Sequence, residues 1–151
     1  MARTSPGAVA RSEKAVARAE GREAAGEAKR PEVPGGPFTT RQLLRIDEAL
    51  AAADRETGLT FSVYVGPLDE GTTREHAERL HDRIAGHEAA VLLAVSPNQR
   101  VLEIVTGEQS DKRLPRQACA LAALSMTASF GGGDLAGGIV TGLRMLTDQA
   151  T

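Results

Sequence analysis

Seven consecutive apolar residues, Ala89–Val95, restrict the fold of this chain more than any other feature. A strand without a polar face must be covered on both sides, which is typical of a central strand in an α/β sheet. The turn residues Ser-Pro-Asn-Gln follow at 96–99, and Val101–Thr106 then predicts another strand. The simplest arrangement is an antiparallel hairpin, because the connection is so short.

An earlier strand is predicted over Leu59–Gly66, where large apolar side chains alternate with smaller or polar ones. One face of that strand should be well buried, and it carries Phe61, Val63 and Val65. A helix to about residue 85 follows, with capping-box spacing between Thr72 and Glu75 and a stop at Gly86. A helical connection of this kind predicts that the strands on either side of it run parallel.

Three more helices complete the pattern. The first runs to about Thr57 from a cap at Thr39 or Thr40, and the next spans about Pro115–Ser129. The last begins at Asp134 after three glycines. The order α-β-α-β-β-α-α predicts a small three-layer α/β sandwich, with a mixed sheet of three to four strands and helices on both faces.

The folded domain is expected over residues 38–151, and residues 1–37 are expected to be a disordered arm and linker. The arm has no Leu, Ile or aromatic residue, so it cannot bury enough apolar surface to offset the entropy of ordering it. Seven basic and five acidic residues give it a charge of +2, and the domain then carries −4. The arm could touch an acidic partner or be a solvated tail.

Composition excludes several classes of function. Aromatic residues make up 3% of the chain and the net charge is −2, which argues against nucleic-acid binding. The single cysteine excludes an internal disulfide and a cysteine-rich zinc site. No apolar run approaches the length of about 18 residues that a membrane helix needs, and no signal peptide is evident. The expected location is the cytoplasm.

Histidine and cysteine do not form a recognisable catalytic pattern. His76 and His81 are five residues apart and diverge around a helix, and His87 lies beyond the expected helix stop. We therefore interpret all three as ordinary surface histidines. Cys119 lies among Ala and Leu, which predicts a small buried apolar side chain.

The triple glycine Gly131, Gly132 and Gly133 is the most unusual motif. Glycines before a helix can bind a phosphate through free backbone N–H groups. The positive charge of Arg116 could favour an anion at such a site. A tight turn closed by an Asp134 cap is the alternative, and that carboxylate would oppose an anion. A cation held by Asp134 with Asp111 or Asp69 is a further interpretation, with calcium or magnesium as the ion. The preferred alternative is that these acids are solvated loop residues and that no cofactor is bound.

The pattern resembles the TPM-domain family, named for a thylakoid lumen protein, a photosystem II repair protein and a nematode receptor modulator. More narrowly it resembles short actinobacterial proteins of unknown function. The similarity covers about Phe38–Met145. Its carriers are the strand Phe-Ser-Val-Tyr-Val-Gly (61–66), the hairpin Val-Leu-Leu-Ala-Val-Ser-Pro-Asn-Gln-Arg (91–100) with Val-Leu-Glu-Ile-Val-Thr-Gly (101–107), and Phe-Gly-Gly-Gly-Asp-Leu-Ala-Gly-Gly-Ile (130–139).

The resemblance implies a mixed sheet between helices, and it implies several activities, because some TPM domains act as acid phosphatases, some bind calcium and others assist membrane complexes. Gly133 and Asp134 match the family's Gly-Asp. The family often has an acid after Leu-Pro, where this chain has Arg116, and an aromatic residue after Gly-Asp, where it has Leu135. Two hypotheses follow: a noncatalytic binding or assembly module with an unknown protein partner, or a metal-assisted phosphatase.

Overall fold

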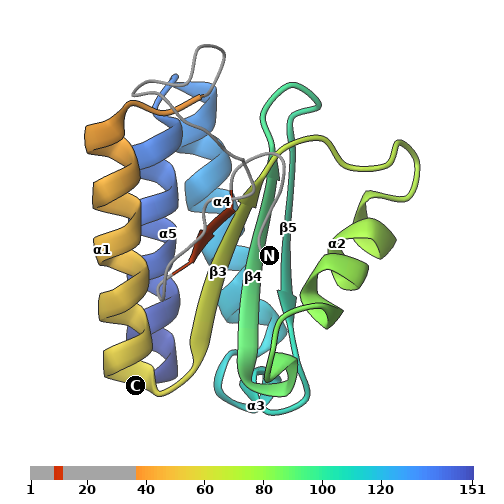
Figure 1. Ribbon diagram of the computed structural model, residues 1–151, viewed down its shortest axis with the longest axis vertical. Helices are drawn as coiled ribbons and strands as arrows, with labels where there is room; N and C mark the ends of the chain where they lie inside the picture. Colours follow the sequence, from red (N-terminus) through yellow and green to blue (C-terminus); the bar gives the residue numbers. More distant parts are fainter. Residues whose placement is uncertain (1–8, 12–36) are drawn as a thin grey trace.

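The computed structural model describes residues 9–11 and 37–151. Its centre is a four-stranded mixed sheet with the strand order β1-β3-β4-β5 (Figure 1). The strands are β1 (Val9–Arg11), β3 (Thr60–Val65), β4 (Ala90–Ser96) and β5 (Val101–Thr106). β3 and β4 are parallel, while β1 and β5 pair antiparallel with β3 and β4, respectively. The predicted mixed sheet and hairpin are confirmed.

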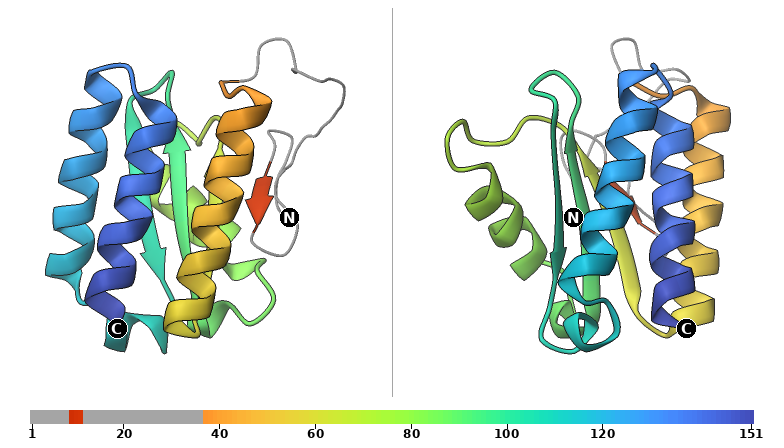
Figure 2. Two further views of the ribbon diagram at one scale, coloured as in Figure 1. Left: turned by 90° about the vertical axis from the view of Figure 1, so that its left-hand side faces the viewer. Right: turned by 180° about the vertical axis from the view of Figure 1, so that it is seen from behind.

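Helices cover both faces of the sheet, as predicted (Figures 1 and 2). One face is covered by α1 (Thr40–Thr57), α4 (Arg116–Gly131) and α5 (Leu135–Ala150). The left view of Figure 2 shows α5 between α1 and α4. The opposite face is covered by α2 (Thr73–Asp82), which packs on β4 and β5. None of the helices in the described part of the chain is long and apolar enough to cross a membrane.

The two middle strands form the centre of the core. All seven residues of β4 are buried. Six of them belong to the apolar run that predicts this burial, and the seventh, Ser96, is the first residue of the predicted turn. β3 departs from the prediction of a single well-buried face, because Ser62 and Tyr64 on its other face are buried too. Tyr64 lies against His76 of α2, with ring centroids 6.5 Å apart, so the loop and helix that follow β3 cover this second face.

Capping chemistry sets both ends of α1. At the start of α1, Gln42 N–H donates to Thr39 Oγ1 at 3.1 Å, and Thr39 N–H donates to Gln42 Oε1 at 2.9 Å, which is a reciprocal capping box. Gly58 ends the helix in the left-handed region with φ 77°. The capping box predicted at Thr72 is not formed, because the Thr72 side chain makes no cap hydrogen bond.

Two segments expected to be irregular contain short elements. β1 lies within the predicted disordered arm, of which residues 1–8 and 12–36 are outside the described residues. It pairs through backbone groups with β3, which would otherwise be a sheet edge among the described strands. The predicted polar loop after β5 contains α3 (Ser110–Arg113). Ser110 is fully buried, and its hydroxyl donates to Ala90 O at 2.9 Å.

Candidate functional site

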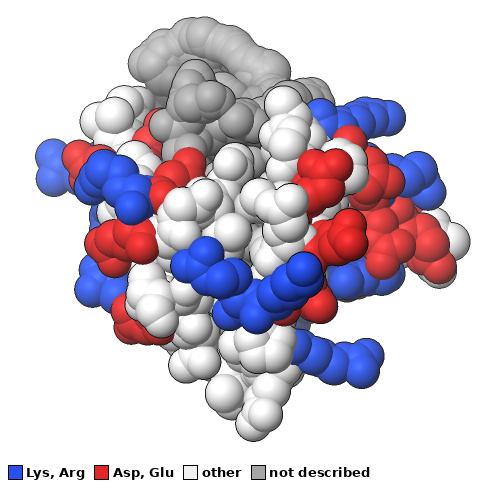
Figure 3. Space-filling model, turned by 90° about the horizontal axis from the view of Figure 1, so that it is seen from below, with Lys and Arg blue, Asp and Glu red and all other residues white. Residues whose placement is uncertain are grey.

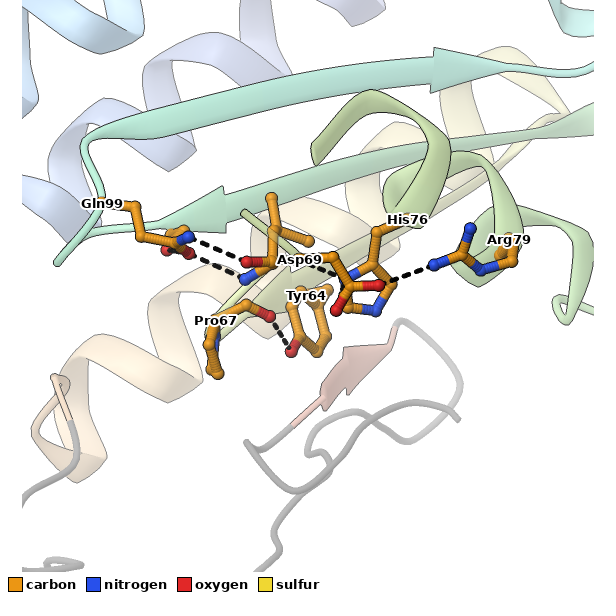
Figure 4. Close-up of polar contacts among 8 residues, drawn as sticks. Tyr64, Pro67, Asp69, His76, Arg79 and Gln99 are labelled. Atoms are coloured by element: carbon orange, nitrogen blue, oxygen red, sulfur yellow. Dashed lines mark hydrogen bonds and ion pairs between the residues drawn. The ribbon is translucent and has the colours of Figure 1, made fainter. Parts of the chain in front are cut away.

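The carboxyl ends of β3 and β4 form the upper edge of the sheet, which is where α/β sheets commonly bind ligands (Figure 1). Here the loop after β3 is fastened to the β4–β5 turn by Gln99 (Figure 4). Gln99 Oε1 accepts from Leu68 N–H, and Gln99 Nε2 donates to Leu68 O, both at 2.8 Å. Tyr64 supports the same loop by donating its hydroxyl hydrogen to Pro67 O at 2.8 Å.

Asp69 joins this loop to α2. Its carboxylate accepts from Arg79 Nη2 at 2.8 Å, while its backbone N–H donates to His76 Nδ1 at 2.9 Å (Figure 4). His76 Nδ1 also lies 3.5 Å from Asp69 Oδ1, so the imidazole contacts both the backbone and the carboxylate of Asp69. The polar groups of Asp69, His76 and Arg79 hydrogen-bond to one another and so hold the loop after β3 against α2.

Asp134 acts as the N-cap of α5, as predicted, with its Oδ1 accepting from Gly137 N–H at 2.9 Å. The glycine turn before it differs from a phosphate cradle. The backbone N–H groups of Gly132, Gly133 and Asp134 donate to carbonyl oxygens in the last turn of α4, at 2.9 to 3.2 Å. An anion would have to replace these bonds as well as approach the Asp134 carboxylate.

Two of the other predicted site residues, Asp111 and Arg116, are far from this turn. α4 has 16 residues and so is about 24 Å long. Arg116 is the first residue of α4 and Asp111 lies in α3 just before it, whereas the glycines and Asp134 follow at its last end. Asp111 and Arg116 therefore do not share a site with Asp134. Asp69 is at the upper edge of the sheet, and there it pairs with Arg79.

Two side chains that the sequence suggested were ordinary have distinctive surroundings. His81 is 3% exposed, so the interpretation of a surface histidine is wrong for this residue, which packs where α2 meets β4. Cys119 is only partly buried. Burial raises the pKa of its thiol, and the negative charge of Asp111 adds to that effect while Arg74 opposes it. A raised pKa disfavours the thiolate that a nucleophile needs.

The outer face of α4 is apolar but uncovered. Leu121 is 51% exposed and Leu124 is 69% exposed. No charged residue lies between Arg116 and Asp134, and the exposed positions among them are Gln117, Ala120, Leu121, Leu124, Thr127, Ala128 and Gly131–Gly133. In the sequence, this exposed face is visible only as a stretch without charged residues between Arg116 and Asp134. A helix of that composition is normally interpreted as buried.

The lower end of the molecule has a different surface. Seen from below, basic and acidic side chains are interspersed around it, with uncharged surface between them (Figure 3). Among the residues that the structure describes, this face shows no extended area of one sign. Polyanion binding depends on such an area, so this face does not suggest it.

Comparison with known proteins identifies the family of this chain and proteins that share its fold. A family described as "Domain of unknown function (DUF5130)" matches residues 12–147. Two uncharacterized proteins of Mycobacterium tuberculosis, MT2543 and Rv2468c, are each 33% identical over 111 residues, which cover 74% of this chain and 66% of the relative. The chain thus spans about two thirds of the length of these relatives.

Solved structures share the fold at low sequence identity. The BA42 protein of Bizionia argentinensis matches with a TM-score of 0.68 at 14% identity, covering 75% of this chain and 81% of that one. The N-terminal domain of a P. gingivalis protein matches with a TM-score of 0.67 at 19% identity, covering 76% of both chains. Identities this low show similarity of fold alone.

Proposed function

The chain belongs to the DUF5130 family of domains of unknown function, and on this premise we propose that it is a TPM-like, noncatalytic assembly module that associates with a second copy of itself through α4. The TPM-like assignment is supported by the mixed sheet between helices and by the Gly133-Asp134 step that opens α5. The assembly role is supported by the surface of α4.

The observation that carries the proposal is the exposure of Leu121 and Leu124 on a helix face without charges. Exposed apolar patches on folded domains commonly mark interaction surfaces. The third large exposed apolar side chain, Leu44, is on α1 beside the exposed charged residues Arg41, Arg45 and Glu48. Isolated exposed leucines of that kind are normal, so α4 is the distinctive surface.

A second copy is the occupant that suits this face best. In a two-fold interface the same patch meets itself, so a patch of one charge would repel its partner. The outer face of α4 carries no charge between Gln117 and Gly131, and the small side chains of Ala120 and Ala128 permit close approach of a second helix. One helix face is smaller than the roughly 800 Å² per partner of a standard interface. We therefore expect weak, concentration-dependent association.

The alternative of a metal-assisted phosphatase would require several oxygen ligands around Asp134. Asp134 Oδ1 instead accepts the cap hydrogen bond from Gly137 N–H, and Asp111 lies at the other end of α4. This geometry favours the binding module over the phosphatase.

Analytical ultracentrifugation of the full chain over a wide concentration range tests the proposal. We expect the mean mass to rise toward that of a dimer, and Leu124→Glu or Leu121→Glu to hold the protein as a monomer. Leu44→Glu is the matched control, because it adds the same charge at another exposed leucine. A wild-type monomer at millimolar concentration, or equal dissociation by Leu44→Glu, would contradict self-association.

A further inference from the structure

Three side chains of the types that ligate metals meet where α2 ends and β4 begins. His81 and Asp82 are the last two residues of α2, and His87 begins the short 3-10 helix η1 (His87–Ala89) that precedes β4. Gly86, in the left-handed region at φ 71°, reverses the chain between them. The rings of His81 and His87 lie edge to face, with centroids 5.7 Å apart.

The hydrogen bonding of His81 leaves one ring nitrogen able to bind a metal. Its side chain is 4% exposed, and its Nε2 lies 3.0 Å from Ala90 O. A carbonyl oxygen only accepts, so Nε2 is the donor, and the corresponding neutral tautomer has its lone pair on Nδ1. That Nδ1 lies 3.9 Å from Asp82 Oδ1, beyond hydrogen-bond distance. A backbone carbonyl on the other ring nitrogen is the usual second partner of a metal-binding histidine.

The backbone at His87 is fixed by the loop after β5. Gln109 N–H donates to Glu88 O at 2.8 Å. A Cβ atom at Gly107 would overlap the carbonyl oxygens of His87 and Glu88, so only glycine allows this close approach. The same loop carries Ser110, whose hydroxyl donates to Ala90 O and so helps to fix the acceptor for His81. The loop after β5 thus holds the backbone of His87 and the hydrogen-bond acceptor of His81 in place.

We propose that His81, Asp82 and His87 bind one divalent transition-metal ion of the zinc class. One ligand atom from each of the three residues lies within 4.8 Å of the others, and no other group of three such side chains is found among the described residues. Ligands of a tetrahedral zinc ion at about 2.0–2.1 Å are separated by roughly 3.4 Å. Small rotations of Asp82 and His87 close this difference, because their side chains are 69% and 41% exposed.

The ligand set determines the class of metal. Two imidazoles and one carboxylate suit zinc and its neighbours, whereas calcium and magnesium prefer sites built from oxygen alone. Three protein ligands leave a fourth position for water or for a group from another molecule. Glu88 also lies near, with Oε2 3.9 Å from His87 Nε2.

Competition titration of Zn²⁺ against a chromophoric chelator tests the site, with the full chain purified without a histidine tag. We expect one ion per chain, with affinity lowered about tenfold or more by His87→Ala and by Asp82→Asn. Both side chains are partly or largely exposed, so these variants avoid disturbing the core, as circular dichroism should verify. His76→Ala is the matched control, because it removes a histidine of α2 that lies outside the cluster.

Three outcomes would overturn the proposal. The first is a wild-type chain that takes up no Zn²⁺ at submillimolar concentration, and the second is a His87→Ala chain that binds as tightly as the wild type. The third is an equal loss of affinity in the His76→Ala control. Analytical ultracentrifugation in excess chelator separates this proposal from the assembly proposal, because self-association through α4 does not require the metal.

Discussion

Gly142 on α5 lies directly against Met126 on α4, and a Cβ atom at Gly142 would overlap the Met126 side chain. A Cβ at Gly138, one turn earlier, would lie 2.7 Å from a ring carbon of Phe130. Both glycines are buried in α5. The absence of side chains at these positions therefore allows α4 and α5 to pack closely, and it places α4 with its other face outward.

We expect Gly142→Ala to destabilise the domain by about 1–2 kcal/mol, since Met126 is fully buried and its movement overpacks the helix interface. This expected loss is the net value: replacing glycine by alanine also gains roughly 1 kcal/mol in helix propensity, which offsets only part of the overpacking cost. Urea denaturation measures the difference. Gly131→Ala is the control, because nothing lies within 4 Å of a Cβ there. Equal stability of the two variants would show that Met126 relaxes without cost.

Asp134→Ala should lower the free energy of unfolding by about 1 kcal/mol, because it removes the hydrogen bond that caps α5. Asp134→Asn keeps an accepting oxygen and should lose less. In a thermal-shift assay we expect calcium, magnesium and manganese at millimolar concentration to affect wild type and Asp134→Ala alike. A calcium-dependent rise in Tm that Asp134→Ala abolishes would instead indicate a cation site at this cap.

Arg113 joins the carboxyl-terminal ends of two helices. Its Nη2 donates to Thr57 O of α1 at 3.0 Å, and its Nε donates to Ala150 O of α5 at 2.9 Å. The last carbonyls of a helix lack intrahelical partners, so these bonds satisfy groups that otherwise face solvent. We expect Arg113→Ala to cost about 1–3 kcal/mol in chemical denaturation. Arg113→Lys should be more stable than Arg113→Ala but less stable than the wild type, because one ammonium group cannot reproduce the hydrogen bonds of the planar guanidinium group. A lysine variant as stable as the wild type would show that the positive charge alone is sufficient.

Cys119 provides a test at alkaline pH. Because burial and Asp111 raise the pKa of its thiol, the folded chain holds the thiol proton more tightly than the unfolded chain. The resulting contribution to stability is present below the unfolded pKa of about 8.5 and is lost as the pH rises through the folded pKa. We expect a thiol reagent at pH 8.5 to react more slowly with native protein than with protein in urea. Cys119→Ala should lose less stability than the wild type as the pH rises. An equal loss in both proteins would show that other titratable groups cause it.

The local features of this protein were predictable from sequence because they depend on residues only a few positions apart. Capping by Thr39 and Asp134 requires partners three residues away. The burial of β4 follows from its run of apolar side chains, and with it the need for helices on both faces. The capping box at Thr72 failed although its spacing was right, which shows that spacing permits such a bond without forcing it.

What the sequence alone determined is therefore the order of the main elements, the mixed sheet and the presence of helices on both of its faces. Only the tertiary structure decided which polar groups meet. The length of α4 separates Asp111 from Asp134, and the chain reversal at Gly86 brings His87 back to His81. Convergence of side chains depends on the direction of strands and on the path of their connections, whereas periodicity reports only which face of one element is apolar.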